Sequence, residues 1–310
     1  MTKVFIVGSE GTTGLRLHSR MEERSDVELI EINSELRKDS AEIKRLIEQA
    51  DFVFLCLPDD AARETVELAK GTDARIIDTS TAHRTSNGWA YGFPELSAKH
   101  RNDICSAKHV ASPGCHASGF ISLVYPLISA GVISADCPIS CVSLTGYSGG
   151  GKKMIADYEN SEKNTELDSP KLYALGQTHK HLPEIVAQCG LSQAPIFMPI
   201  VDDFYAGMLV SIPLHAANLN GKYTLSELRK IYKSHYSGSK LVRVMDDAPS
   251  ALFTNTLAGR DDMEIFISGS DESILLSARF DNLGKGASGA AIQCFNIMCG
   301  AREETGLVLA

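Results

Sequence analysis

Short apolar segments alternate with amphipathic segments through the first third of the chain, and this alternation constrains the fold most. The spacing predicts strands at residues 3–7, 27–32, 52–57 and 75–78, separated by helices at residues 14–23, 40–49 and 61–70. Strands that alternate with helices form right-handed β–α–β units, in which a parallel sheet carries helices on both faces. The sequence therefore predicts an N-terminal α/β domain with a parallel sheet.

The pattern changes after residue 115. Longer segments with partial polar and apolar alternation predict a mostly antiparallel sheet, with strands at residues 139–146, 207–215, 241–244, 264–268 and 273–280. Helical spacing returns at residues 287–301. We expect a first domain at residues 1–114, completed by a C-terminal helix at residues 284–310, and a second, α+β domain at residues 115–283.

Composition and charge exclude several classes of function. The 310 residues carry a net charge of −9 and no basic block, which argues against nucleic acid as a partner. No segment approaches the ~20 apolar residues of a membrane span, and the N-terminus is similar to a first strand and not to a signal peptide. The eight cysteines form no Cys-x-x-Cys pair, so neither a metal site nor a disulfide framework is predicted. These features indicate a cytoplasmic enzyme.

A glycine-rich loop follows the first predicted strand and opens the first helix. Its spacing is G-x-x-G-x-x-G, which departs from the common G-x-G-x-x-G. Glycines at such a turn let a pyrophosphate approach the N–H groups of the helix N-terminus. We interpret the domain as a Rossmann-type dinucleotide-binding domain. The expected cofactor contacts in the loop are Gly8, Glu10, Gly11, Thr12, Thr13 and Gly14.

The end of the second predicted strand leaves the choice between NAD and NADP open. Glu31 is an acidic residue of the kind that holds the ribose hydroxyls of NAD. Ser34, followed by Arg37 and Lys38, would instead accommodate the 2′-phosphate of NADP. Two solvated surface cations are an equally good interpretation of Arg37 and Lys38. We expect Ser34 to contact the cofactor.

Cys115 follows a Pro-Gly turn and precedes an apolar run with helical spacing. This pattern places its sulfur at a helix N-terminus, where unpaired N–H groups and the helix dipole favour an anion. Such a position lowers the pKa of a thiol and makes it nucleophilic. A lone cysteine is more often a buried structural residue. The other motifs of the chain favour the catalytic interpretation.

His179 and His181 stand just before a helix that Pro183 is expected to open. A histidine near neutrality can take the proton of a thiol and later protonate an oxyanion. His179 is our first choice for this role and His181 the second, because the sequence orients neither ring. A polar surface loop is the alternative interpretation.

Two further polar clusters are candidates for binding an anionic substrate. Ser80 and Arg84 follow a strand at its carboxyl end, where open α/β sheets bind ligands, and an arginine there can grip a phosphate. Lys152 and Lys153 follow three consecutive glycines. Solvated surface residues are the alternative interpretation for both clusters.

Together these motifs resemble the short form of the N-acetyl-gamma-glutamyl-phosphate reductase family, within the semialdehyde dehydrogenase superfamily. The matching segments follow the order of the family along the chain and are residues 8–14, 78–84, 91–95, 113–115, 146–153, 179–185 and 281–287. One departure concerns the residues after the cysteine, which are His116-Ala117-Ser118 here and Tyr-Pro-Thr in the longer members. Substrate contacts of the long form therefore do not carry over to these three positions.

The resemblance implies that the chain reduces an acyl phosphate to an aldehyde with NADPH, in arginine biosynthesis and as a homo-oligomer, a dimer or a tetramer. It implies a thioester on Cys115, with the second domain serving catalysis and dimerisation. Arg84 and Ser80 would hold the phosphate, and Lys152 or Lys153 the substrate carboxylate. Asn282 would contact the carboxamide of the nicotinamide.

Three other functions compete with this one. Aspartate-semialdehyde dehydrogenases share the fold and the chemistry, but they resemble the chain less around residues 179–185. A thiol hydrolase would use Cys115 and His179 and would leave the glycine-rich loop without a role. A nucleotide-sensing regulatory protein that has lost catalysis is the alternative outside the enzymes, and the intact Cys115, His179 and Arg84 argue against it.

Overall fold

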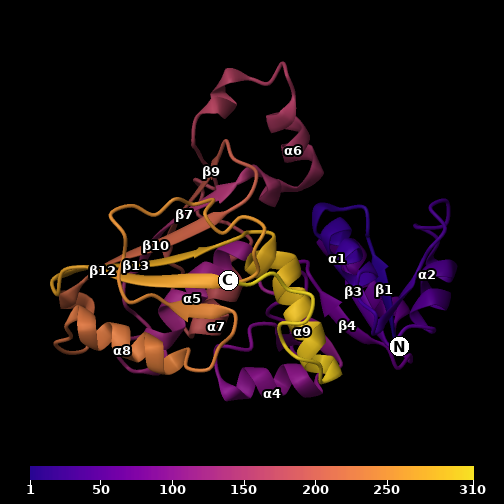
Figure 1. The fold of residues 1–310 in the computed structure, drawn as a ribbon, viewed down its shortest axis with the longest axis horizontal. Helices are drawn as coiled ribbons and strands as arrows, with labels where there is room; N and C mark the ends of the chain where they lie inside the picture. The colour runs from indigo at the N-terminus through magenta and orange to yellow at the C-terminus, as the bar shows by residue number, and fades with distance from the viewer. The chain divides into compact units, whose positions relative to one another are not determined.

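The computed structural model describes residues 1–310 and divides into two compact units (Figure 1). The first unit contains Met1–Gly114 and Ala287–Leu307, and the second contains Cys115–Gly286 and Val308–Ala310. The division thus falls immediately before Cys115 and within the glycine-rich segment after Asn282. None of the helices is both long enough and apolar enough to cross a lipid bilayer.

The first unit is built on a six-stranded sheet in which every pair of neighbouring strands is parallel. Its strands lie in the order β2 (Val27–Ile30), β1 (Thr2–Val7), β3 (Phe52–Leu55), β4 (Arg75–Asp78), β6 (His109–Ala111) and β5 (Ala90–Tyr91). The order reverses between β1 and β3, and such a switch point is where open α/β sheets bind ligands. This confirms the predicted α/β fold with an N-terminal parallel sheet.

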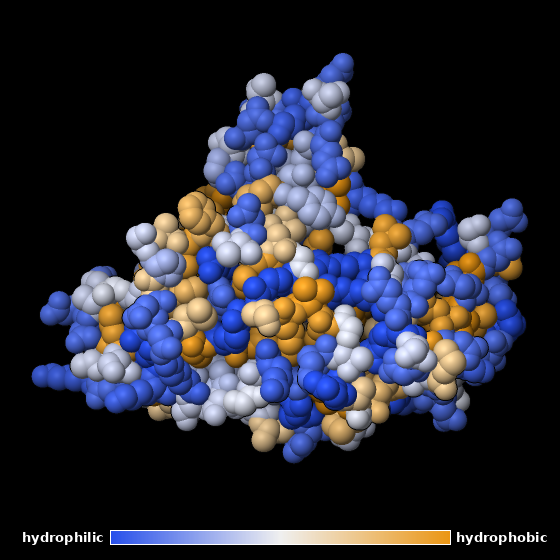
Figure 2. Space-filling model, viewed as in Figure 1, coloured by the Kyte–Doolittle hydropathy of each residue, from blue (hydrophilic) through white to orange (hydrophobic).

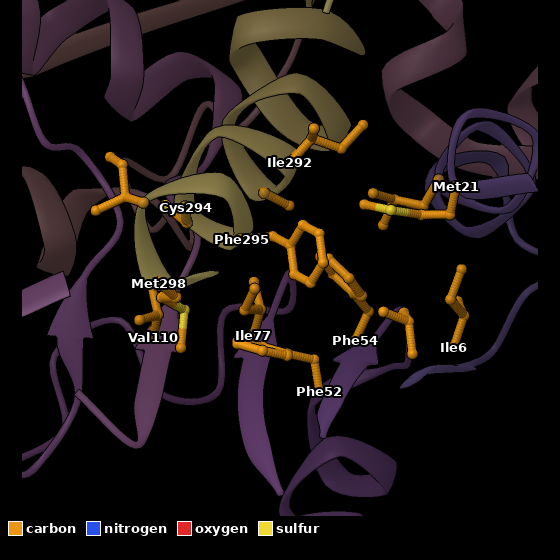
Figure 3. Close-up of a cluster of buried hydrophobic side chains, with 14 of the residues drawn as sticks. Ile6, Met21, Phe52, Phe54, Ile77, Val110, Ile292, Cys294, Phe295 and Met298 are labelled. Atoms are coloured by element: carbon orange, nitrogen blue, oxygen red, sulfur yellow. The ribbon is translucent and has the colours of Figure 1, made fainter. Parts of the chain in front are cut away.

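Alternate residues of β1 explain why this sheet has helices on both sides. Val4 and Ile6 face one apolar cluster, which also contains residues of α1 (Thr12–Glu22), α4 (Ala98–Ser106) and α9 (Gly289–Cys299). Figure 3 shows Phe295 of α9 between Met21, Phe54 and Ile77 in this cluster. Phe5 and Val7 face the other cluster, which is formed with α2 (Ser40–Ile47) and α3 (Asp59–Leu68). Both faces are buried, as the nearly continuous apolar strands require.

The second unit is built on a seven-stranded mixed sheet. Its strands lie in the order β11 (Val242–Val244), β12 (Met263–Gly269), β13 (Ser273–Phe280), β10 (Met208–His215), β7 (Ser140–Gly146), β9 (Ile196–Asp202) and β8 (Lys171–Leu172). The remaining α-helices of this unit are α5 (Cys115–Ser129), α6 (Gly151–Glu159), α7 (Leu182–Cys189) and α8 (Leu225–His235). Helix α5 packs against β10 and β13, so closely that a side chain at Gly119 would collide with Val210.

Several details of the second half differ from the sequence prediction. Strands β8 and β9 were not predicted. Strand β9 pairs in parallel with β7, and β11 pairs in parallel with β12, so the sheet is mixed although most of its pairs are antiparallel. The C-terminal helix is shorter than residues 284–310. It follows a π-helical turn at Gly284–Ser288 and ends at Cys299, because Gly300 adopts a left-handed conformation with φ of 70°.

Candidate active site

A cleft of about 350 Å³ opens at the switch point of the first sheet. The loop after β1 and the loop after β3 form its walls, and the segment after β2 closes it with Ser34, Arg37 and Lys38. Gly8, Glu10 and Gly11 of the expected cofactor contacts line the cleft. Gly8 has a φ of 87°, and a Cβ there would lie 2.4 Å from the carbonyl oxygen of Cys56. Only glycine therefore fits at this turn.

The start of α1 carries the remaining expected contacts of the loop. Helix α1 begins at Thr12, with Gly11 as an N-cap that forms no side-chain hydrogen bond. The hydroxyl oxygen of Thr12 is buried and has no hydrogen-bond partner. An anionic oxygen bound at this helix N-terminus would accept a hydrogen bond from the buried hydroxyl. The residues present therefore fit the pyrophosphate of a dinucleotide.

Glu31 lies outside this cleft. Its neighbour Ile32 lines the cleft, whereas the Glu31 carboxylate is exposed and lies 2.8 Å from Nε2 of His18. The Arg37 guanidinium lines the cleft and forms an ion pair with Glu10. Arg37 therefore lines the cleft beside Glu10, whereas Glu31 does not line it.

A buried network surrounds Asp78 at the end of β4. Asp78 accepts hydrogen bonds from the Ser80 hydroxyl at 2.7 Å and from its backbone N–H at 2.9 Å, and His83 Nδ1 lies 2.6 Å from the same carboxylate. Arg84 is also buried and donates to the backbone carbonyls of Ser112 and Thr79. Ser80 and Arg84 thus stabilise the loop after β4 and the segment that leads to Cys115. Whether they also bind substrate stays a prediction.

Cys115 is the first residue of α5 and is half-buried, whereas nearly all later residues of the helix are buried. Gly286 lies so close that a Cβ on it would be 2.9 Å from the Cβ of Cys115. The Ser118 hydroxyl, one turn into the helix, is buried and has no hydrogen-bond partner. The thiol therefore stands at a helix start beside glycine backbone, and the first turn of the same helix carries a buried hydroxyl without a hydrogen-bond partner.

Both predicted histidines join a cluster around His116. The rings of His179 and His181 lie 5.2 and 5.5 Å from the His116 ring, and 4.7 Å from each other. His181 is buried at the N-cap of α7, and its backbone N–H donates to Nδ1 of His179 at 3.2 Å. A neutral His179 with an accepting Nδ1 carries its proton on Nε2. The neutral ring of His179 therefore donates hydrogen bonds through Nε2 and not through Nδ1.

Tyr173 and Ser143 belong to this cluster, and the sequence did not indicate either. His116 Nδ1 lies 2.7 Å from the Ser143 hydroxyl, and His116 Nε2 lies 2.8 Å from the Tyr173 hydroxyl. Burial is the main cause that lowers the pKa of His116, and with the charges of His179 and Lys180 it brings the value to about 3. Burial also raises the pKa of Tyr173, and the nearby charge of Cys115 adds to this effect.

Asn282 lies in the second unit and is buried. Its amide donates to the Ser148 hydroxyl at 3.0 Å and accepts from the backbone N–H of Gly207 at 2.8 Å. These bonds fix the side chain next to the segment between β7 and α6. A contact with the nicotinamide stays a prediction.

Lys152 and Lys153 are exposed on α6. This helix belongs to a segment whose surface is mostly hydrophilic, at the top of the view in Figure 2. The solvated interpretation describes both side chains as they stand, and their contact with substrate stays a prediction.

Two family models match the chain. The one described as "Semialdehyde dehydrogenase, NAD binding domain" matches residues 3–104, and "Semialdehyde dehydrogenase, dimerisation domain" matches residues 115–282. An N-acetyl-gamma-glutamyl-phosphate reductase from Nostoc sp. is 43% identical over 98% of this chain and 99% of its own length. One from Brucella anthropi is 44% identical over 96% of this chain and 98% of its own.

Solved structures agree in fold. An aspartate semialdehyde dehydrogenase from Francisella tularensis has a TM-score of 0.73 at 16% identity, covering 96% of this chain and 100% of its own. The enzyme from Candida albicans, solved with NADP, has a TM-score of 0.70 at 15% identity, covering 96% of this chain and 99% of its own. The chain therefore belongs to the semialdehyde dehydrogenase family and, within it, to the N-acetyl-gamma-glutamyl-phosphate reductases, which are oxidoreductases.

Proposed function

We propose that this chain converts N-acetyl-γ-glutamyl phosphate to N-acetylglutamate semialdehyde and phosphate, with NADPH, as a cytoplasmic step of arginine biosynthesis. The observation that carries the proposal is Cys115 at the first turn of α5, in a unit that also gathers three histidines. A cysteine at a helix start suits attack on an acyl phosphate. The names of relatives that match nearly the whole chain support this substrate.

Cys115 acts as the nucleophile. Its thiolate forms a bond from Sγ to the acyl carbon, the bond from that carbon to the phosphate oxygen breaks, and phosphate leaves with the electron pair. The product of this step is a thioester on Cys115. N–H groups in the first turn of α5 are suited to stabilise the oxyanion of the tetrahedral intermediate, because they point along the helix toward its start.

His179 is the acid–base residue of the proposal, and His181 is the second choice. His179 is half-buried and His181 is buried, so a substrate reaches the first more readily. The hydrogen bond from the backbone of His181 leaves the proton of a neutral His179 on Nε2, from which it can be donated to a developing negative charge.

The cleft of the first unit would hold NADPH. Thr12, Thr13 and Gly14 at the start of α1 would bind the pyrophosphate, and Ser34 with Arg37 the 2′-phosphate. When bound, the reduced nicotinamide supplies the hydride for the thioester, a chemistry that no side chain offers. Asn282 is the candidate for its carboxamide.

Two polar clusters are candidates for binding the anionic ends of the substrate. Ser80 and Arg84 are proposed for the phosphate, and Lys152 or Lys153 for the carboxylate. We also infer a homo-oligomer assembled through residues 115–282, the range matched by the dimerisation-domain model.

An assay in the reverse direction tests the function. N-acetylglutamate semialdehyde, phosphate and NADP⁺ should give NADPH absorbance with the wild type, and aspartate semialdehyde should give far less. Cys115→Ala should retain less than about a thousandth of the rate, given the cost of removing a nucleophile, and should bind NADPH normally. Cys105→Ala, which removes an exposed thiol on α4, is the matched control. Preference for aspartate semialdehyde, or an active Cys115→Ala, would refute the proposal.

A further inference from the structure

We propose that Tyr173 is a catalytic residue whose hydroxyl donates a hydrogen bond to the oxyanion formed when Cys115 attacks the acyl phosphate. Neutral His116 positions this hydroxyl. The inference rests on the proposed function for its substrate. It adds a hydrogen-bond donor to the histidine and the helix start already described.

Tyr173 contacts the side chain of the residue that follows the reactive cysteine. His116 directly follows Cys115 in α5, and its Nε2 lies 2.8 Å from the Tyr173 hydroxyl. The negative charge of a Cys115 thiolate contributes to the raised pKa of the phenol. A donor near the sulfur is suited to an oxygen on the carbon that is bonded to that sulfur. The phenol keeps its proton at neutral pH, because burial and the thiolate both raise its pKa.

The direction of the hydrogen bonds decides whether Tyr173 can donate. A neutral imidazole has one N–H and one acceptor nitrogen. If the buried Ser143 hydroxyl donates to Nδ1, then Nε2 carries the hydrogen and donates to the Tyr173 oxygen. The phenolic hydrogen is then available for the substrate. In the opposite tautomer the Tyr173 hydroxyl donates its hydrogen bond to Nε2, and no hydrogen is left for the substrate.

The surroundings of His116 keep the ring neutral. The groups that contact it are the Ser143 and Tyr173 hydroxyls, the rings of His179 and His181, and the apolar ring of Phe197. The positive charge of Lys180 also acts on it and lowers its pKa. None of these is an acid that would stabilise an imidazolium. The ring therefore remains a fixed hydrogen-bond bridge over the whole neutral pH range.

The loop after Tyr173 is held in an unusual conformation. Ala174 and Gln177 adopt left-handed backbone angles, with φ of 52° and 54°, although neither is glycine. The Gln177 side chain bonds both backbone groups of Phe197, each at 2.8 Å. The Tyr173 N–H donates to the carbonyl of Pro199 on β9 at 3.1 Å. Non-glycine residues in this region persist where surrounding contacts enforce them, often at functional sites.

The tautomer can be measured without substrate or cofactor. Imidazole ¹⁵N chemical shifts distinguish a protonated ring nitrogen from an unprotonated one, and the His116 signals are assigned by their loss in His116→Gln. We expect a protonated Nε2 and an unprotonated Nδ1 at neutral pH in the wild type. A protonated Nδ1 would overturn the proposal, because the phenolic hydrogen would then be taken by Nε2.

The role in catalysis is tested by the release of phosphate in a single turnover without NADPH, which reports thioester formation alone. Tyr173→Phe should slow this release by at least about tenfold, and by about 10²–10³-fold if the hydroxyl has the usual value of one oxyanion donor. Labelling of Cys115 by iodoacetamide should stay within twofold of the wild type, since the hydroxyl acts on the oxyanion and not on the thiol. Loss below tenfold, or labelling that falls in step with release, would overturn the proposal.

Three variants separate positioning from a general structural effect. Tyr158→Phe removes another buried tyrosine hydroxyl of the same unit, one without a hydrogen-bond partner, and should leave release unchanged. His116→Gln retains a donor at the position of Nε2 and should lose less than His116→Leu. His116→Leu combined with Tyr173→Phe should be no slower than Tyr173→Phe alone, because both act through one hydroxyl. Additive losses would contradict this coupling.

These experiments also separate the inference from the proposed function. A wild type that neither releases phosphate nor reduces the substrate would refute the function, and the ¹⁵N measurement would still test the arrangement of His116 and Tyr173. An active wild type with an unaffected Tyr173→Phe would refute the inference alone.

Discussion

Arg37→Ala should change the cofactor preference of this enzyme. The guanidinium lines the cleft at the switch point and is the cation on the segment after β2 that also forms an ion pair with Glu10. A hydrogen bond to a charged group contributes about 1.5–3 kcal/mol. The Arg37 side chain is 49% exposed, so solvent screening reduces the expected contribution to about 1–1.5 kcal/mol. The dissociation constant of NADPH should therefore rise roughly five- to twelvefold.

Isothermal titration of NADPH and NADH into the wild type and the variant measures this change directly. Binding of NADH, which lacks the 2′-phosphate, should remain within about twofold in Arg37→Ala. Arg45→Ala is a matched control, because Arg45 is 54% exposed and ion-paired with Glu42 but does not line the cleft. Glu10→Gln should retain or increase NADPH affinity, since it removes a carboxylate that competes for Arg37. A wild type that prefers NADH, or an equal loss of both cofactors in Arg37→Ala, would refute the reasoning.

Three further predictions concern the second unit and the cysteines. Replacing His179 by Asn should lower turnover by roughly 10²–10⁴, the range for general acid–base catalysis, and more than His181→Asn; equal small losses would remove both from this role. Gly286→Ala should reduce turnover and the rate at which iodoacetamide labels Cys115, because the added methyl would lie 2.9 Å from the Cys115 Cβ; unchanged values would contradict that contact. Peptide mapping after brief labelling at neutral pH should find Cys115 and the exposed Cys105 modified first. The thiols that should be protected, because burial raises their pKa values, are Cys56, Cys141 and Cys189.

Four of the six strands of the first unit, β1 to β4, could be predicted from sequence because they carry their own signal, whereas the short strands β5 and β6 were not predicted. Parallel strands buried on both faces are short continuous apolar runs, as in Phe52–Leu55, and the helices between them have a periodic apolar face. The strand bounds differ by only one or two residues. The end of the second strand is an example, since it stops at Ile30 and not at residue 32.

The region between α6 and β10 could not be predicted in the same way. Strand β9 contains Pro199 and Asp202, so its composition is not typical of a central strand. Its parallel pairing with β7 is made by residues that are more than fifty positions apart in the chain. Such a strand is specified by the neighbour that it joins and not by a local pattern.

The same limit applies to the candidate site. Cys115, His179 and His181 are in motifs whose chemistry is visible in the sequence, and the structure brings both histidines to the ring of His116. Tyr173 is in no such motif. The only signal that could have indicated the cluster is a histidine directly after the cysteine at a helix start, where the next residue points into the core.

The choice of cofactor shows how a single residue position decides an interpretation. Glu31 and Ser34 were competing signals for NAD and NADP because side chains of an extended segment alternate between two sides. In the structure Ile32 lines the cleft, so the side chain before it points away and binds His18. Glu31, the acid expected to select NAD, therefore lies away from the cleft, which is lined by Ser34, Arg37 and Lys38 together with Glu10. His18→Ala should consequently leave the ratio of NADPH to NADH affinity unchanged, although it removes the partner of Glu31.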